Sequence, residues 1–90
     1  MVVIISLTHL SGGSLEICVQ RPQHDAHASR NYPSLEKVRA TLLDFGIGEQ
    51  VLDEHLKLLP QLGPGQPVRF PPVDVPHHDL VAEGFKIGMG

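Results

Sequence analysis

Six histidines in a chain of 90 residues are the side chains best suited to chemistry. Two short segments combine imidazole with carboxylate groups: H-D-A-H, beginning at residue 24, and H-H-D, beginning at residue 77. Imidazole and carboxylate groups bind zinc and related divalent metals. If the two segments converge, they predict a metal site or a small-ligand site. The candidate ligands are His24, Asp25, His27, His77, His78 and Asp79.

A simpler interpretation is that these histidines are solvated loop side chains. Zinc signatures place their ligands at fixed offsets on a defined scaffold, as the helical H-E-x-x-H pattern does. This chain has no such pattern, and its single cysteine excludes a zinc site built from several thiolates. The pattern therefore favours solvated histidines, and zinc or a similar metal belongs to the alternative.

His55 raises a separate question, because it lies on the apolar side of a predicted helix. At about 100° per residue, a helix over 48–59 places Val51, Leu52 and Leu56 on one side. His55 projects among these three residues. A polar ring in apolar surroundings needs a hydrogen-bond partner. We expect either a core histidine that donates to a backbone carbonyl or a ring that lines a pocket or an interface.

No motif of an enzyme is found in the sequence. To act as a nucleophile, Cys18 would need a lowered pKa, and a neighbouring carboxylate such as Glu16 raises the pKa of a thiol. The glycines fit neither the G-x-S-x-G turn of serine hydrolases nor the loops that bind phosphate. We therefore name no catalytic residue, and an enzyme is the less favoured class.

Composition narrows the partners and the compartment. The formal net charge is −3, and the seven lysines and arginines are spread along the chain. Nucleic-acid binding needs a basic footprint, which this distribution does not provide. The opening apolar run is too short to span a membrane. With no disulfide framework, we expect a cytoplasmic protein that binds neither nucleic acid nor membrane.

The order of apolar and polar residues predicts the elements. Strict alternation after a glycine-containing turn indicates a hairpin, a polar stretch without periodicity indicates a loop, and frequent prolines prevent a long helix. The predicted organisation is a β-hairpin at 1–20, a polar loop at 21–33, a helical hairpin at 34–59 and a proline-rich arm at 60–90, with one short strand and a helical turn in the arm.

The helical hairpin carries the clearest local signals. Ser34 is the predicted N-cap of its first helix, and Gly46 is the predicted residue that ends it. The second helix must stop before Pro60. The apolar stripe predicted to face the core in the first helix consists of Leu35, Val38, Leu42 and Phe45.

Residues 42–52 resemble the helix–loop–helix of ubiquitin-associated domains, in which a loop of the M-G-F/Y type precedes a helix that begins with a polar pair. Here the loop reads Phe45-Gly46-Ile47, the methionine is missing, and the third helix of that fold would fall on the proline-rich stretch. The resemblance implies a two-helix hairpin. Neither ubiquitin binding nor any site residue is carried over.

Together these expectations describe a small α+β single domain over 1–90. It has an N-terminal β-hairpin, a two-helix hairpin packed on one sheet face, and a proline-rich extended C-terminal arm. A sheet of two or three strands is marginal alone, so an apolar strand edge favours burial in a partner. We expect a non-enzymatic protein–protein interaction module, a homodimer or an accessory subunit; a metal- or small-ligand-binding protein is the alternative. The expected interface residues are Val3, Ile5, Leu7, Leu43, Phe70 and Phe85.

Overall fold

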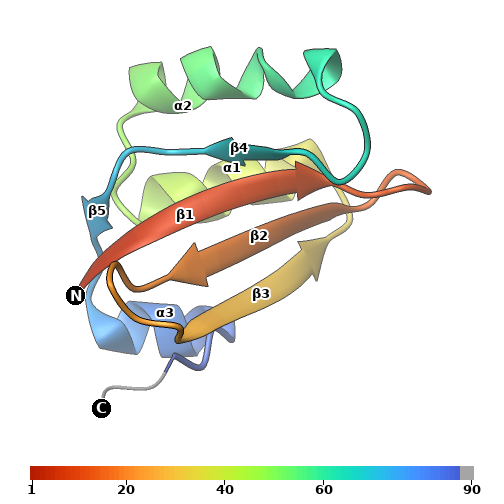
Figure 1. The fold of residues 1–90 in the computed structure, drawn as a ribbon. Helices are drawn as coiled ribbons and strands as arrows, with labels where there is room; N and C mark the ends of the chain where they lie inside the picture. Colours follow the sequence, from red (N-terminus) through yellow and green to blue (C-terminus); the bar gives the residue numbers. More distant parts are fainter. Residues whose placement is uncertain (88–90) are drawn as a thin grey trace.

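An antiparallel sheet with helices packed on one face forms the domain in the computed structural model, which describes residues 1–87 (Figure 1). The strand order is β3–β2–β1–β4, and β5 also pairs with β1. The predicted small α+β domain is confirmed. The elements are β1 (Val2–His9), β2 (Leu15–Gln20), β3 (His27–Tyr32), α1 (Leu35–Asp44), α2 (Glu49–Leu56), the 3-10 turn η1 (Leu59–Gln61), β4 (Pro67–Arg69), β5 (Val73–Asp74) and α3 (His77–Glu83).

The predicted N-terminal hairpin, β1 and β2, lies at the centre of the sheet. Its turn places Gly12 and Gly13 at φ values of 94° and 91°, a left-handed conformation that glycine adopts without steric cost. Side chains of the second strand alternate between the core and the opposite face, as predicted. The buried residues of β2 are Leu15, Ile17 and Val19.

The predicted polar loop over 21–33 contains a strand, β3, and this part of the prediction is wrong. β3 pairs antiparallel with β2, from Gln20 opposite His27 to Leu15 opposite Tyr32. Tyr32 is the one buried residue of β3, and four of the other five are exposed. A strand this exposed has no apolar alternation, which is the signal by which strands are predicted.

The first helix begins and ends at the residues that the sequence predicts. The Ser34 hydroxyl accepts a hydrogen bond from the Lys37 amide at 3.3 Å, which caps α1. At the other end Gly46 has a φ of 98°, and the Ile47 amide donates to the Leu42 carbonyl at 3.2 Å. This geometry is a Schellman motif, in which a left-handed glycine closes the helix.

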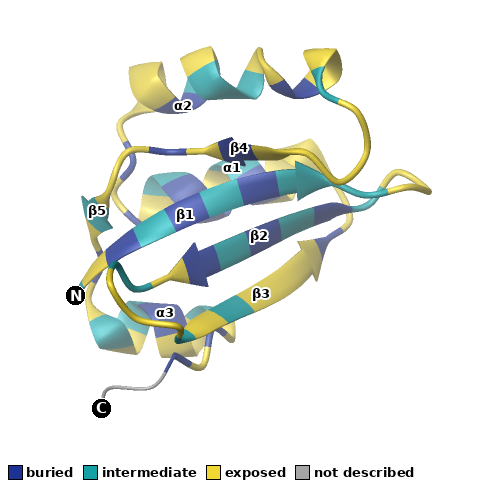
Figure 2. Cartoon of the chain, in the orientation of Figure 1, coloured by how far each residue is buried: buried dark blue, intermediate teal, exposed yellow. Residues whose placement is uncertain are grey.

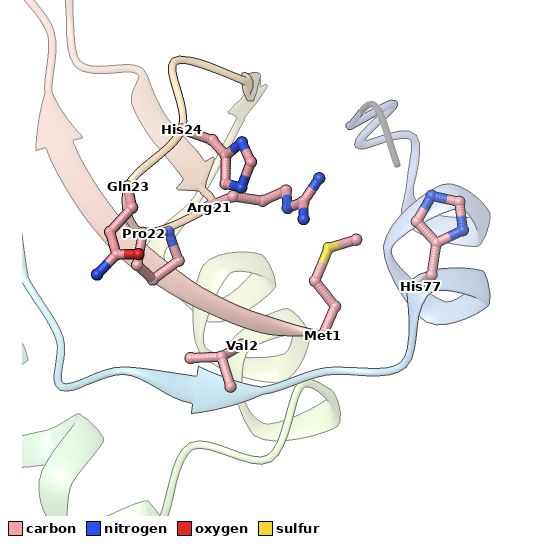
Figure 3. A pocket seen from close by; sticks show the side chains of 7 residues that line it. All are labelled: Met1, Val2, Arg21, Pro22, Gln23, His24 and His77. Atoms are coloured by element: carbon pink, nitrogen blue, oxygen red, sulfur yellow. The ribbon is translucent and has the colours of Figure 1, made fainter. Parts of the chain in front are cut away.

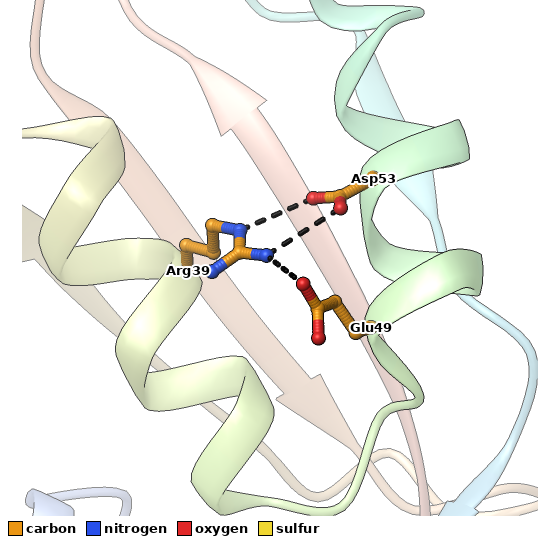
Figure 4. Close-up of polar contacts among 3 residues, drawn as sticks. All are labelled: Arg39, Glu49 and Asp53. Carbon is orange, nitrogen blue, oxygen red and sulfur yellow. Dashed lines mark hydrogen bonds and ion pairs between the residues drawn. The ribbon is translucent and has the colours of Figure 1, made fainter.

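One arginine connects the two predicted helices (Figure 4). Arg39 of α1 donates to the Asp53 carboxylate at 3.1 Å and to the Glu49 carboxylate at 3.0 Å, both on α2. These contacts raise the pKa of Arg39, chiefly through the hydrogen bond to Asp53. The ion pairs join the exposed sides of the two helices, where solvent screens them, while the buried sides pack on the sheet.

The buried face of α1 is rotated relative to the predicted stripe. Leu35 is 43% exposed, whereas Thr41 is buried. The reason lies in β3: α1 packs against β3 as well as β2, and the Thr41 side chain lies close enough to the Tyr32 hydroxyl to oppose the rise in the pKa of Tyr32 that burial causes. On α2, Val51 is exposed rather than buried, while Leu52 occupies the core.

The proline-rich segment is part of the sheet rather than an extended appendage. The predicted short strand and helical turn are present, and β4 and β5 both pair with β1. Between the pairs Leu7–Val68 and Val3–Val73, β1 advances four residues and the arm five. The extra residue makes a bulge at 71–72, where two prolines have no amide to donate. The last residues of the predicted arm, 88–90, lie outside the described residues.

The core lies between the sheet and the helices, and buried residues alternate with less buried ones along β1 and β2 (Figure 2). It is mostly aliphatic, as the low aromatic content predicts. Phe45 of the α1 C-terminus and Phe85 after α3 meet edge to face, with ring centroids 5.8 Å apart. The C-terminal segment therefore contributes directly to the core.

Candidate functional site

The side chains predicted to form an interface lie mostly in the core, and for five of the six the prediction is wrong. β1 lies between β2 and β4, so neither of its edges is free. Leu43 is only half-buried, and it packs against the core. A side chain buried within its own chain offers no surface to a partner. The five buried residues are Val3, Ile5, Leu7, Phe70 and Phe85.

Two of the histidines predicted as ligands line one cavity (Figure 3). His24 comes from the loop between β2 and β3, and His77 is the first residue of α3. The cavity has a volume of about 610 Å³, and Arg21 and Met1 also line it. One histidine from each segment thus lines the cavity, from different sides of it, and the metal or small-ligand site stays a prediction.

The remaining predicted ligands have other neighbours. His27 donates from Nδ1 to the Asp25 carbonyl at 2.9 Å. His78 lies 3.1 Å from the Asp79 carboxylate, and its side chain is 84% exposed. Within residues 1–87 no three histidine, cysteine, aspartate or glutamate side chains are grouped so that they could hold a metal ion. The described arrangement thus supplies two imidazoles and no third ligand.

His55 has the structural role that the helix pattern allowed. Its Nδ1 donates to the Val51 carbonyl one turn earlier, at 2.7 Å. Its ring lies over Phe70 of the arm, with centroids 5.1 Å apart and planes 30° from parallel. The half-buried ring therefore packs between α2 and the segment after β4. Its Nδ1–H has a hydrogen-bond acceptor in the Val51 carbonyl.

Cys18 lies on the sheet face opposite the helices, and its surroundings do not activate it. Burial raises the pKa of the Cys18 thiol, and the Glu16 carboxylate raises it further, while a hydrogen bond with Ser6 opposes both. A thiolate is the nucleophilic form, so a raised pKa makes this cysteine less reactive at neutral pH. This agrees with the sequence-based expectation.

The backbone of β3 presents unpaired groups to solvent. The hydrogen bond from the Arg21 amide to the Ala26 carbonyl shows that even-numbered residues of this strand bond to β2. In an antiparallel ladder the direction of the backbone groups alternates along the strand. The N–H and C=O groups of His27, Ser29 and Asn31 therefore point away from β2. In the described part of the chain, no strand pairs with that edge.

The charge on this edge is nearly neutral. Arg30 is its only arginine or lysine, and its guanidinium turns toward α3. There it donates to the Glu83 carbonyl and lies 3.7 Å from the Glu83 carboxylate. It also lies over the Tyr32 ring, 5.5 Å from the centroid. Of the devices that protect strand edges in proteins, β3 lacks lysines, prolines and bulges, and it has one inward-pointing charge, Arg30.

The free edge is the feature that sequence reasoning missed. It was hidden because 21–33 shows no periodicity, and because an edge is defined by the pairing order of strands far apart in the chain.

Comparison of the chain with family models, with curated proteins and with solved structures found no match. Among residues 1–87, no helix is long and apolar enough to cross a membrane.

Proposed function

We propose that this chain is a non-enzymatic protein–protein interaction module that joins an extended segment of another chain to its sheet along β3. The observation that supports the proposal is the alternation of the ladder, which leaves the backbone groups of His27, Ser29 and Asn31 directed outward. Addition of a strand to such an edge is a recurrent mode of recognition, with affinity from main-chain hydrogen bonds. The proposed setting is the cytoplasm.

The opposite edge of the sheet is a poor alternative for the same role. β4 has three residues and β5 has two, and the bulge with two prolines separates them. Short strands, prolines and bulges are the devices by which proteins protect an edge from pairing. β3 is six residues long and uninterrupted. The contrast between the two edges favours β3 as the interaction surface.

The polar chemistry of the domain favours binding over catalysis. Cys18 is deactivated by its surroundings, and His55 already donates to a carbonyl. The cavity beside His24 and His77 lacks a third ligand among the residues that the structure describes. The proposal therefore assigns no catalytic residue and no cofactor to this chain.

Site-specific photo-crosslinking tests this proposal. A photoreactive amino acid at Ser29, on the edge, is compared with one at Glu54, on the exposed side of α2. We expect a protein adduct of discrete mass from position 29 and none from position 54. The adduct should disappear when Asn31→Pro is added, since Asn31 has an outward amide and its replacement leaves the ladder to β2 intact.

The control separates edge pairing from accidental contact. An adduct that persists with Asn31→Pro, or that forms equally from both positions, would mean that the photoreactive group captured a passing protein. In that case the proposal would fail. Circular dichroism of each variant verifies that the fold is retained.

A further inference from the structure

We propose that the partner of β3 is β3 of a second copy, paired antiparallel about a two-fold axis that passes between the two Ser29 residues. This inference rests on the proposed function, because it names the occupant of the same edge. It commits to one register and so to one set of opposed residues. The dimer would form a continuous sheet with the helices of both copies on one face.

The register follows from symmetry and from the direction of the backbone groups. A two-fold axis normal to the sheet keeps the same face upward in both copies, so directly opposed residues must belong to the same face. Centred on Ser29, the arrangement sets His27 opposite the partner's Asn31 and Ser29 opposite its own symmetry mate. All three outward-directed residues of each edge then face outward-directed residues, and every free amide and carbonyl on them finds a partner.

The neighbouring symmetric registers are worse. Centring the axis on Ala28 or on Arg30 leaves one of the three outward-directed residues without a counterpart within β3. Centring on Arg30 also sets two guanidinium groups directly opposite one another, and like charges in that position are destabilising. In the Ser29 register each Arg30 faces the partner's Ala28 and keeps its contact with Glu83.

The side chains of the edge are also compatible with pairing between two identical strands, because they carry no like charges that would oppose each other on the open face. Its exposed side chains on the open face are an imidazole, a hydroxyl and an amide, with no formal charge among them. Serines directly opposed across two strands form hydrogen bonds. An interface of two short edge strands is small, so the dimer is expected to be weak and to form with rising concentration.

Disulfide trapping tests the register in purified full-length protein. Cys18 is first replaced by serine, because it is the cross-strand neighbour of Ser29 and would compete. Ser29→Cys in this background should form a covalent dimer under mild oxidation, since the two thiols face each other at the axis. Asn31→Cys is the matched control on the same face and edge. In the Ser29 register the two Asn31 residues are displaced by four residues, about 13 Å along the strand.

We expect Ser29→Cys to cross-link at least tenfold faster than Asn31→Cys, and a mixture of His27→Cys and Asn31→Cys chains to give the mixed dimer. Equal rates, or faster linking through Asn31, would overturn the register. If neither variant cross-links while position 29 still gives edge-dependent adducts with a different protein, the second copy is wrong and the proposed function stands. Loss of both results would remove the two proposals together.

Discussion

Cys18 and Ser29 lie directly opposite one another across β2 and β3, yet they share no backbone hydrogen bond. The backbone groups of Cys18 pair with Ser6 on β1, whereas those of Ser29 point outward, because alternate residues of a ladder face opposite sides. Such non-hydrogen-bonded pairs bring Cα atoms to about 4.5 Å. This pair therefore marks both the register of β3 and its free edge.

The Cys18–Ser29 pairing predicts an intrachain disulfide. In Ser29→Cys with Cys18 retained, mild oxidation should remove both free thiols while the protein stays monomeric and loses only the mass of two hydrogen atoms, because the two side chains lie on the same face. Thiol titration and mass spectrometry measure this. Arg30→Cys, one residue along and on the other face, should keep both thiols reduced. Retained thiols in the Ser29 variant would mean that 27–32 is not paired in this register.

Proline substitutions should distinguish the two sides of β3. Ala28→Pro removes an amide that bonds to β2, so we expect it to lower the free energy of unfolding by about 1–3 kcal/mol more than Ser29→Pro does. Ser29→Pro removes only an outward amide. Urea denaturation of the two variants gives the comparison. Equal losses, or a larger loss at position 29, would be inconsistent with the assigned direction of the backbone groups.

The N-cap of α1 should contribute measurably to stability. Ser34→Ala removes the acceptor of the Lys37 amide, and the expected cost is about 1 kcal/mol in the free energy of unfolding. Ser11→Ala, in the exposed turn of the first hairpin, is the matched control and should change stability by less than about 0.5 kcal/mol. Similar values for both serines would show that the capping bond is not formed.

Phe85 tests whether the C-terminal segment belongs to the core. Phe85→Ala should cost about 3–5 kcal/mol of unfolding free energy, because the ring is fully buried and packs against Phe45. Val81→Ala, on the exposed side of α3, should cost far less. If both variants were equally mild, Phe85 would be available for a partner, as the sequence alone suggested.

The raised pKa of the Cys18 thiol predicts that the stability of the fold falls at alkaline pH. This pKa is raised above the ordinary value of a thiol, by burial first and by the Glu16 carboxylate second. The unfolded thiol therefore ionises before the folded one, and the fold loses stability as the pH rises past the ordinary thiol pKa. Alkylation should be slow near neutrality, and Glu16→Gln should make it faster by lowering the thiol pKa. An unchanged rate in Glu16→Gln would remove the carboxylate as a cause.

The elements that the sequence predicts well are those with local signals. The alternation in 15–20 identifies β2, and the capping serine and terminal glycine identify the bounds of α1. β3 escapes prediction because only Tyr32 is buried, which leaves no period of two. The interface prediction failed for a non-local reason: β4 returns to pair with β1, so an apolar strand that resembles an edge becomes the centre of the sheet.

The candidate site could not be predicted from the residues that form it. His27, Ser29 and Asn31 are ordinary polar residues, and their importance comes from the direction of their backbone groups in a four-strand order. The histidine segments carried a stronger chemical signal, yet only His24 and His77 reach a common cavity. Residue type indicates possible ligands, whereas strand order decides which backbone groups remain free.

Residue-resolved amide hydrogen exchange is the decisive test of the free edge of β3, because it distinguishes N–H groups bonded to β2 from those that point outward. In dilute protein, we predict fast exchange at His27, Ser29 and Asn31 and slow exchange at Ala28 and Arg30. At high concentration the three fast amides should become protected as the edge is paired. Uniform protection along the strand, or the reverse alternation, would contradict the free edge from which the proposed function is argued.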